Sequence, residues 1–208
     1  MVLPLTSLRK LNSKHCITEC LWYLRGEDNI AYLQRHGNPF WNPFADEKGW
    51  VGLNYGLLTN WPTGNSEAPR CNQLEEKVLA KLVAGASSRN MTCSLCGETA
   101  EVKTNQEACT STCSFVVHGD GEGEQLDLVL HQRSSDVAIG LVFDVVVWSI
   151  LLHLVCREVT RRTMGTPQAR TLTAGKLTMH LINAHVYDAN VEAVREIATR
   201  SPKDASES

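Results

Sequence analysis

The longest apolar segment of the chain, residues 137–156, constrains its fold more than any other feature. A run of this length could cross a bilayer as one helix. Asp144, Ser149 and His153 interrupt the run, and Gly140 lies near its start. An aspartate at the centre of a membrane helix costs about 2.5–3.5 kcal/mol on insertion scales. We therefore expect the buried central helix of a globular domain, with a membrane span as the alternative.

Composition favours one folded domain that binds its ligands locally. The chain has 208 residues, of which 43% are hydrophobic, enough for a proper core. Its 20 basic and 23 acidic residues give a net charge of -3, which offers no bulk attraction to nucleic acid or acidic membranes. Residues 1–6 lack the features of a secretory signal, so a cytoplasmic location is expected. We predict a single domain over residues 1–200 and a disordered polar tail over residues 201–208.

Eight cysteines without a secretory signal are expected to be reduced thiols. Cys93-x-x-Cys96 and Cys109-x-x-x-Cys113 have a spacing that could hold a structural zinc. Against this, residues 91–95 have the pattern of a strand, and no turn residue separates Cys93 from Cys96. We therefore predict no metal site, and zinc binding stays an alternative.

Hydrophobic periodicity predicts an alternation of helices and strands. Helical spacing is found in residues 8–24, 29–34, 73–84 and 143–162. The first of these helices is expected to end near Gly26. A last helix is expected after Asn190 as its cap. Strand character is found in residues 91–95, 115–117, 126–130 and 177–186, and a turn at residues 119–123 predicts that the second and third form a hairpin. An aromatic loop is expected over residues 37–61.

One long motif resembles a known enzyme family. Residues 131–144, His-Gln-Arg-Ser-Ser-Asp-Val-Ala-Ile-Gly-Leu-Val-Phe-Asp, resemble the Gln-Arg-Ser-x-Asp-Val-x-x-Gly-x-x-Phe-Asn signature of the thymidylate synthase family. Residues 19–26 resemble its Glu-Leu-Leu-Trp-Phe-Leu-x-Gly, and His185-Val186-Tyr187 resembles its His-x-Tyr. The resemblance covers roughly residues 3–197 and is weakest over residues 65–112.

The resemblance implies an α/β fold with a twisted mixed β-sheet backed by helices, and a homodimer formed through sheet faces. It also implies a pyrimidine nucleoside monophosphate as substrate and 5,10-methylenetetrahydrofolate as co-substrate. The family's N-terminal phosphate loop and C-terminal tail have no counterpart in residues 1–208, so a minimal or inactive relative is an alternative. Neither nucleic acid nor a membrane is expected as a partner.

The chemistry of this family needs a thiolate, because carbon 5 of a pyrimidine becomes nucleophilic only after something adds to carbon 6. Sulfur is a strong nucleophile and also leaves readily. In the family the nucleophilic cysteine lies twenty residues before the arginine of the signature, at the start of a strand. By that count we expect Cys113 to be the nucleophile, because it precedes Arg133 by the same number.

The resemblance also implies roles in substrate binding. An arginine followed by a hydroxyl residue suits a phosphate, so Arg133 and Ser134 are expected there. Arg89 resembles an arginine that each subunit of the family lends to its neighbour's phosphate. The sugar hydroxyl is expected to meet His185 and Tyr187, which would share one face of a strand. Tyr55 is a further substrate-site residue by resemblance.

Proton transfer and the folate site involve further residues. Glu19 resembles the carboxylate that organises water around the base, although helical spacing alone favours a solvated glutamate opposite the stripe Ile17, Cys20, Leu21 and Leu24. Trp41 resembles the aromatic residue that packs against the folate. Asp136, with Gly140 after it, resembles the part of the signature that meets the pterin.

Asp144 replaces the asparagine that thymidylate synthases carry. An amide pairs with uracil, whereas cytosine presents an amino donor and an unprotonated ring nitrogen, which a carboxyl group can match. The same change resembles that in deoxycytidylate hydroxymethylases. We therefore expect hydroxymethylation of dCMP or CMP, with methylation of dUMP as the alternative. A helix N-cap is the structural alternative for Asp144.

Overall fold

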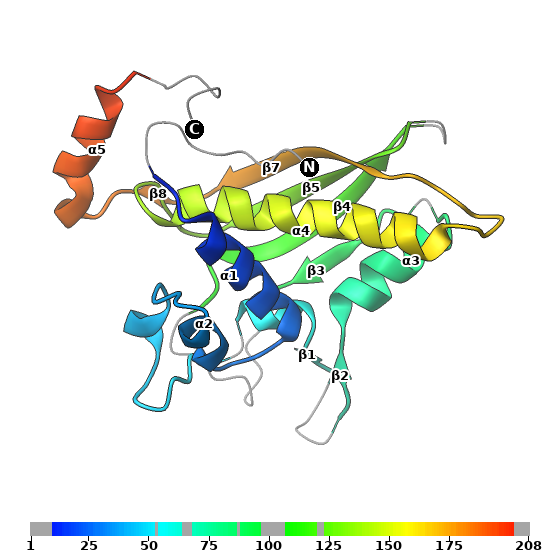
Figure 1. Ribbon diagram of the computed structural model, residues 1–208, viewed down its shortest axis with the longest axis horizontal. Coiled ribbons are helices and arrows are strands. Elements are labelled where there is room, and N and C mark those ends of the chain that lie inside the picture. Colours follow the sequence, from blue (N-terminus) through cyan, green and yellow to red (C-terminus); the bar gives the residue numbers. More distant parts are fainter. Residues whose placement is uncertain are drawn as a thin grey trace.

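A computed structural model describes residues 10–52, 54–63, 68–86, 88–96, 107–119 and 123–201. The predicted start of the first helix at Leu8 and the tail after residue 201 lie outside these ranges. Within them, helices pack on a mixed sheet, as the family resemblance implied (Figure 1).

The central sheet has four strands in the order β3-β4-β5-β7. They are β3 (Thr92–Ser94), β4 (Thr110–His118), β5 (Gln125–Gln132) and β7 (Thr173–Leu181). β4 runs antiparallel to both β3 and β5, which confirms the predicted hairpin of β4 and β5, whereas β7 runs parallel to β5. Because parallel neighbours need a crossover connection, the chain must pass over the sheet between β5 and β7.

Helix α4 (Gly140–Thr163) makes this crossover and confirms the predicted central helix, which begins three residues earlier than expected. Trp148, Leu151 and Leu152 are among its buried residues, packed in the core between sheet and helices. By length and composition α4 could also cross a membrane, but half of its most apolar window is buried inside the protein. Its contacts with α1 and β7 are those of a core helix (Figure 1).

Helix α1 (Ser13–Arg25) lies across α4. Asn12 caps its start, and Gly26 ends it with φ 62°, a left-handed conformation that glycine adopts without strain. The predicted apolar stripe of this helix is only partly correct. Cys16, Cys20 and Tyr23 are buried, whereas Ile17 and Leu21 are exposed. The buried face is therefore rotated toward Glu19.

Short elements follow α1 and complete the core beneath it. They are α2 (Ala31–Arg35), η1 (Asn42–Phe44), η2 (Tyr55–Leu58), β1 (Trp61–Pro62), β2 (Arg70–Cys71), the π-helical η3 (Leu74–Leu79) and α3 (Ala80–Val83). The predicted helix over residues 73–84 is thus half π-helical, and it ends at Gly85 as expected.

The predicted strand over residues 177–186 is wrong as one element. β7 ends at Leu181, and β8 (Ala184–His185) pairs instead with β6 (Ser135–Asp136). The reason is that the segment paired with β7 bends after β5. The N–H of Ile182 still donates to the carbonyl of Gln132 at the end of β5, whereas the carbonyl of Asn183 accepts from the N–H of Ser135 after the bend.

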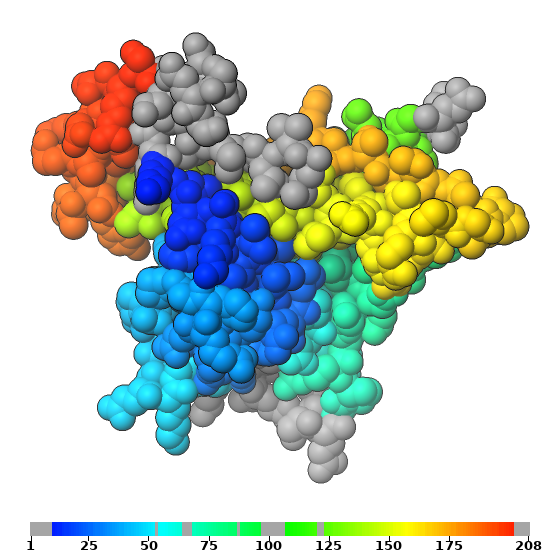
Figure 2. Space-filling view, in the orientation of Figure 1, coloured from blue at the N-terminus to red at the C-terminus, as the bar shows by residue number. Residues whose placement is uncertain are grey.

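Two helical elements end the described chain. η4 (Asp188–Asn190) leads into α5 (Val191–Ala198), which confirms the predicted last helix. Asn190 is the N-cap residue of this helix, as predicted, although its side chain makes no capping hydrogen bond. Helix α5 has no buried residue and stands apart from the sheet (Figures 1 and 2).

Candidate active site

A buried glutamate of α1, Glu19, lies at the centre of a polar cluster. The residues of this polar cluster are Glu19, Tyr23, Trp41, Tyr55, Cys109, Gln132, Arg133 and Asp144. Glu19 is 3% exposed, which contradicts the solvated position that helical spacing favoured. The Tyr23 hydroxyl and the Trp41 indole N–H both donate to its Oε1, at 2.7 and 2.9 Å. Its Oε2 is buried without a partner in the described structure. Burial raises the pKa of Glu19, so its free oxygen can exchange a proton with a ligand.

Tyr55 connects this cluster to the start of β4. Its ring stacks on Tyr23 with centroids 4.4 Å apart. Its hydroxyl accepts a hydrogen bond from the backbone N–H of Cys109, at 3.2 Å. Cys109, and not Cys113, is therefore the cysteine that contacts Tyr55 of η2.

Arg133 holds the backbone that leads to Cys109. Its Nε donates to the carbonyl of Ala108 at 3.1 Å, and its Nη2 donates to the carbonyl of Glu107 at 2.9 Å. The backbone N–H of Arg133 donates to the carbonyl of Cys109. Burial and the charge of Asp144 raise the pKa of the Cys109 thiol above its usual value, and Arg133 and the Tyr55 hydroxyl only partly offset this rise. Arg133 is the cation whose charge favours the Cys109 thiolate.

Asp144 lies in the second turn of α4 and faces the same cluster. Gln132 donates from Nε2 to its Oδ2 at 2.7 Å. Burial, with the nearby Glu19, raises the pKa of Asp144 to about 7, although the bond from Gln132 opposes the shift. The N-cap of α4 is Ile139, so the alternative that Asp144 caps this helix is wrong.

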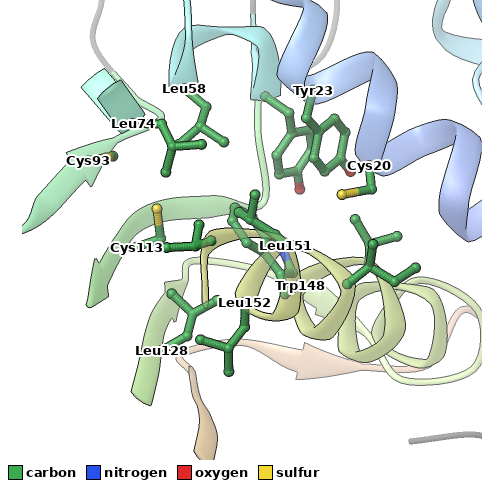
Figure 3. Close-up of a cluster of buried hydrophobic side chains, with 14 of the residues drawn as sticks. Cys20, Tyr23, Leu58, Leu74, Cys93, Cys113, Leu128, Trp148, Leu151 and Leu152 are labelled. Atoms are coloured by element: carbon green, nitrogen blue, oxygen red, sulfur yellow. The ribbon is translucent and has the colours of Figure 1, made fainter. Parts of the chain in front are cut away.

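The structure does not bring Cys113 to this cluster. Its side chain is 0% exposed and lies in the apolar core, near Leu128 and Leu152 (Figure 3). Cys93 is directly opposite on β3. The thiol's hydrogen bond to Cys93, together with burial, raises the pKa of Cys113 well above its usual value. A thiol in this position is buried away from a nucleotide, and the charge of Lys77 lowers its pKa by less than Cys93 and burial raise it.

The hairpin explains why the count of residues pointed to Cys113. The last cross-strand pair is His118 with Gln125, so six residues connect β4 to β5. Two residues would suffice for the shortest common hairpin. Removing four residues from this connection would place Cys109, at the start of β4, twenty residues before Arg133. The sequence signal that could have revealed this is the length of the glycine-rich turn over residues 119–124.

A second group of predicted residues gathers at the N-terminal end of α4. β6 and β8 place Asp136 beside His185. The rings of His185 and Tyr187 are in edge contact, with centroids 5.0 Å apart, although Tyr187 lies beyond the end of β8 and is 60% exposed. The two residues are therefore neighbours without sharing a strand face. Ser134 lies in the bend before β6 and is partly exposed.

Arg89 is exposed in the segment before β3, outside the polar cluster. The cysteines of the zinc alternative are also dispersed: Cys93 and Cys113 lie in the core, and Cys96 is exposed. Within the part of the chain that the structure describes, no three His, Cys, Asp or Glu residues form a group that could hold a metal ion.

Comparison with known families agrees with this site. The family model described as thymidylate synthase matches residues 1–207. The chain belongs to the thymidylate synthase family. Members of this family are one-carbon transferases that act on a pyrimidine nucleotide and use methylenetetrahydrofolate. The polar cluster is the part of this thymidylate synthase fold that holds a thiol, two carboxyl groups and an arginine together.

The residues around Asp136 fit the folate that the family uses. Asp136 Oδ1 accepts from the backbone N–H groups of Ala138 and Ile139, which fixes the carboxyl at the start of α4. A Cβ at Gly140 would stand 3.8 Å from the Asp136 side chain, so glycine keeps space open beside it. Trp41 is buried and belongs to the polar cluster, where its indole N–H donates to Glu19. Asp136 and Gly140 therefore lie together at the start of α4, and Trp41 lies with Glu19.

Proposed function

We propose that this protein is a pyrimidine nucleotide hydroxymethyltransferase that converts dCMP or CMP to the 5-hydroxymethyl derivative with 5,10-methylenetetrahydrofolate. We assign the nucleophile to Cys109 in place of Cys113. The support for this assignment is geometric: Cys109 lies between Tyr55 and Arg133, whereas Cys113 is fully buried in the core.

The observation that carries the choice of base is the environment of Asp144. Its pKa of about 7 means that the carboxyl group is substantially protonated near neutral pH. A protonated carboxyl can donate to the unprotonated ring nitrogen of cytosine and accept from the 4-amino group. Protonation also removes the negative charge that raises the pKa of Cys109, so the same state favours the thiolate.

Each remaining group has a role in the proposed reaction. The Cys109 thiolate forms a bond to carbon 6, which makes carbon 5 nucleophilic. Methylenetetrahydrofolate would supply the one-carbon unit, which becomes bonded to carbon 5. Carbon 5 then loses its proton as the bond from the methylene carbon to the folate nitrogen breaks, and tetrahydrofolate is the leaving group. Water adds to the resulting exocyclic methylene, and the carbon–sulfur bond breaks to release the thiolate and restore the double bond between carbons 5 and 6. Glu19, with Oε2 unpartnered, is placed to move protons to and from the base. Arg133 and Ser134 bind the phosphate, and His185 and Tyr187 bind the sugar.

The decisive experiment incubates the protein with dCMP, CMP or dUMP, each tritiated at carbon 5, and with methylenetetrahydrofolate. We expect tritium release from a cytosine nucleotide and a 5-hydroxymethyl product by mass spectrometry. Turnover of dUMP alone to thymidylate would contradict the proposal and would identify a divergent thymidylate synthase. No release from any nucleotide, with an otherwise folded protein, would identify an inactive relative.

We also propose a homodimer in which Arg89 reaches the phosphate site of the partner subunit. In support, Arg89 is exposed, and the sheet face opposite α4 carries exposed side chains such as Val116 and His131. Sedimentation should give twice the monomer mass. Mixing an Arg89→Ala variant with a Cys109→Ala variant should restore activity in the mixed dimer, since one of its sites would be complete. A monomer, or no restoration, would contradict the shared site.

A further inference from the structure

Gln132 is a buried amide whose two donors are both engaged. It is the last residue of β5 and is 0% exposed. Nε2 donates to Asp144 Oδ2 at 2.7 Å and to Thr110 Oγ1 at 3.2 Å. Its Oε1 is buried without a partner in the described structure. The amide is therefore oriented with one N–H toward the carboxyl of Asp144 and the other toward the hydroxyl of Thr110.

This orientation constrains where Asp144 can carry a proton. In a neutral carboxyl group the carbonyl oxygen is a stronger acceptor than the hydroxyl oxygen, and an oxygen cannot direct its own proton at the N–H that donates to it. The bond from Gln132 to Oδ2 therefore favours the neutral form of Asp144 with its proton on Oδ1. We propose that Gln132 is a positioning residue that fixes the proton on Asp144 Oδ1, and thereby makes the site prefer cytosine over uracil. This inference rests on the proposed function.

The donor and acceptor order of the two bases explains the preference. In cytosine, ring nitrogen 3 accepts and the 4-amino group donates, so Oδ1–H would face the ring nitrogen and Oδ2 would accept from the amino group. Uracil presents the reverse order, with N3–H and a 4-oxo group. To match it, Asp144 would need its proton on Oδ2, which would leave the Gln132 N–H donating to the weaker, hydroxyl acceptor. Specificity of this kind arises from a mismatch imposed on the wrong ligand.

Other titratable groups near Asp144 act on it, or respond to it, through charge. Cys16, Glu19 and Tyr23 belong to α1, Tyr55 belongs to η2, and Cys109 precedes β4. Glu19 raises the pKa of Asp144, whereas the bond from Gln132 lowers it. In a variant without the amide, the pKa of Asp144 should therefore be higher, and the proton should lie on either of its two oxygens.

The test compares wild type with Gln132→Met, which keeps the length of the side chain and removes its donors. Equilibrium binding of dCMP and of dUMP is measured by calorimetry from pH 5 to 9. We expect the ratio of dCMP to dUMP affinity to fall about 10- to 100-fold, the size of a hydrogen bond to a charged group. The pH at which dCMP binding weakens should move upward, because the pKa of Asp144 rises.

Thr110→Val is the matched control, because it removes the other contact of Gln132 and leaves the bond to Asp144 intact. It should keep the wild-type ratio and pH dependence. If Gln132→Met does not fold, Gln132→Glu is used, and its ratio should recover toward wild type at low pH, where the new carboxyl can donate. An unchanged ratio in folded Gln132 variants would overturn the role of Gln132, whichever base the wild type prefers. A wild type that prefers dUMP would instead overturn the proposed function.

Discussion

Cys109 and Cys113 lie four residues apart around the start of β4, yet their surroundings differ in kind. Cys109 contacts a tyrosine hydroxyl, and an arginine and an aspartate act on its thiol through their charges. Cys113 faces a second thiol among aliphatic side chains. The comparison shows that the chemistry of a thiol depends on which groups the fold brings to it, and that its place along the chain is a weak guide.

The largest expected effect that tests this contrast is on catalysis. Cys109→Ala should reduce tritium release from carbon 5 by on the order of 10⁴-fold or more, because no bond to carbon 6 can form. Cys113→Ala should retain most of the activity. The measurement is single-turnover release under saturating substrate. The opposite ranking of the two variants would restore Cys113 as the nucleophile.

For stability, substitution of Cys113 should have the larger effect and substitution of Cys109 the smaller one. Cys113→Ser places a hydroxyl in the apolar core and should lower the free energy of unfolding by about 1–3 kcal/mol. Cys109→Ser should change it by no more than about 0.5 kcal/mol, since Cys109 is only partly buried among polar groups. Urea denaturation of both variants gives the comparison. Equal losses would mean that both thiols are structural.

A smaller effect should separate the two thiols by their response to Asp144. The charge of Asp144 raises the pKa of Cys109. Asp144→Asn removes that charge, so the pKa of Cys109 should fall and its alkylation by iodoacetamide should begin at lower pH. The alkylation of Cys113 should not change. Peptide mass spectrometry after timed alkylation resolves the two sites, and a shift at Cys113 would show that it senses the cluster.

The smallest effect is expected from the hairpin connection. Deleting residues 120–123 leaves Gly119-Glu124 as a two-residue connection, which suits a tight type II′ turn, and keeps Glu124, whose carboxylate pairs with Arg170. The shorter loop should stabilise the protein by about 1 kcal/mol through a lower closure entropy. Activity should persist, although Cys109 would then lie twenty residues before Arg133. Loss of activity would indicate that the long turn itself contributes to function.

Much of the fold and part of the site could be predicted from sequence. The hairpin, the central helix and the signature around Arg133 and Asp144 were correct, because local periodicity and a long motif encode them. Counting residues across a turn of unusual length pointed to Cys113, whereas the contacts of Tyr55 and Arg133 lead us to propose Cys109. Glu19 was placed correctly only by resemblance, since its burial depends on Tyr23 and Trp41 and not on the helical pattern. The bend after Leu181 depends on pairing with β6, which no local pattern reports.

The parallel pairing of β5 with β7 has a kinetic consequence. The hairpin closes over a few residues and brings Cys109, Gln132 and Arg133 together by local contacts. Strand β7 can add only after the whole crossover of α4 has been made, which is a long and slow closure. We therefore expect the thiol, its arginine and the amide to assemble early in refolding. His185 and Tyr187, which follow β7 in the chain and which we propose bind the sugar, should become ordered last.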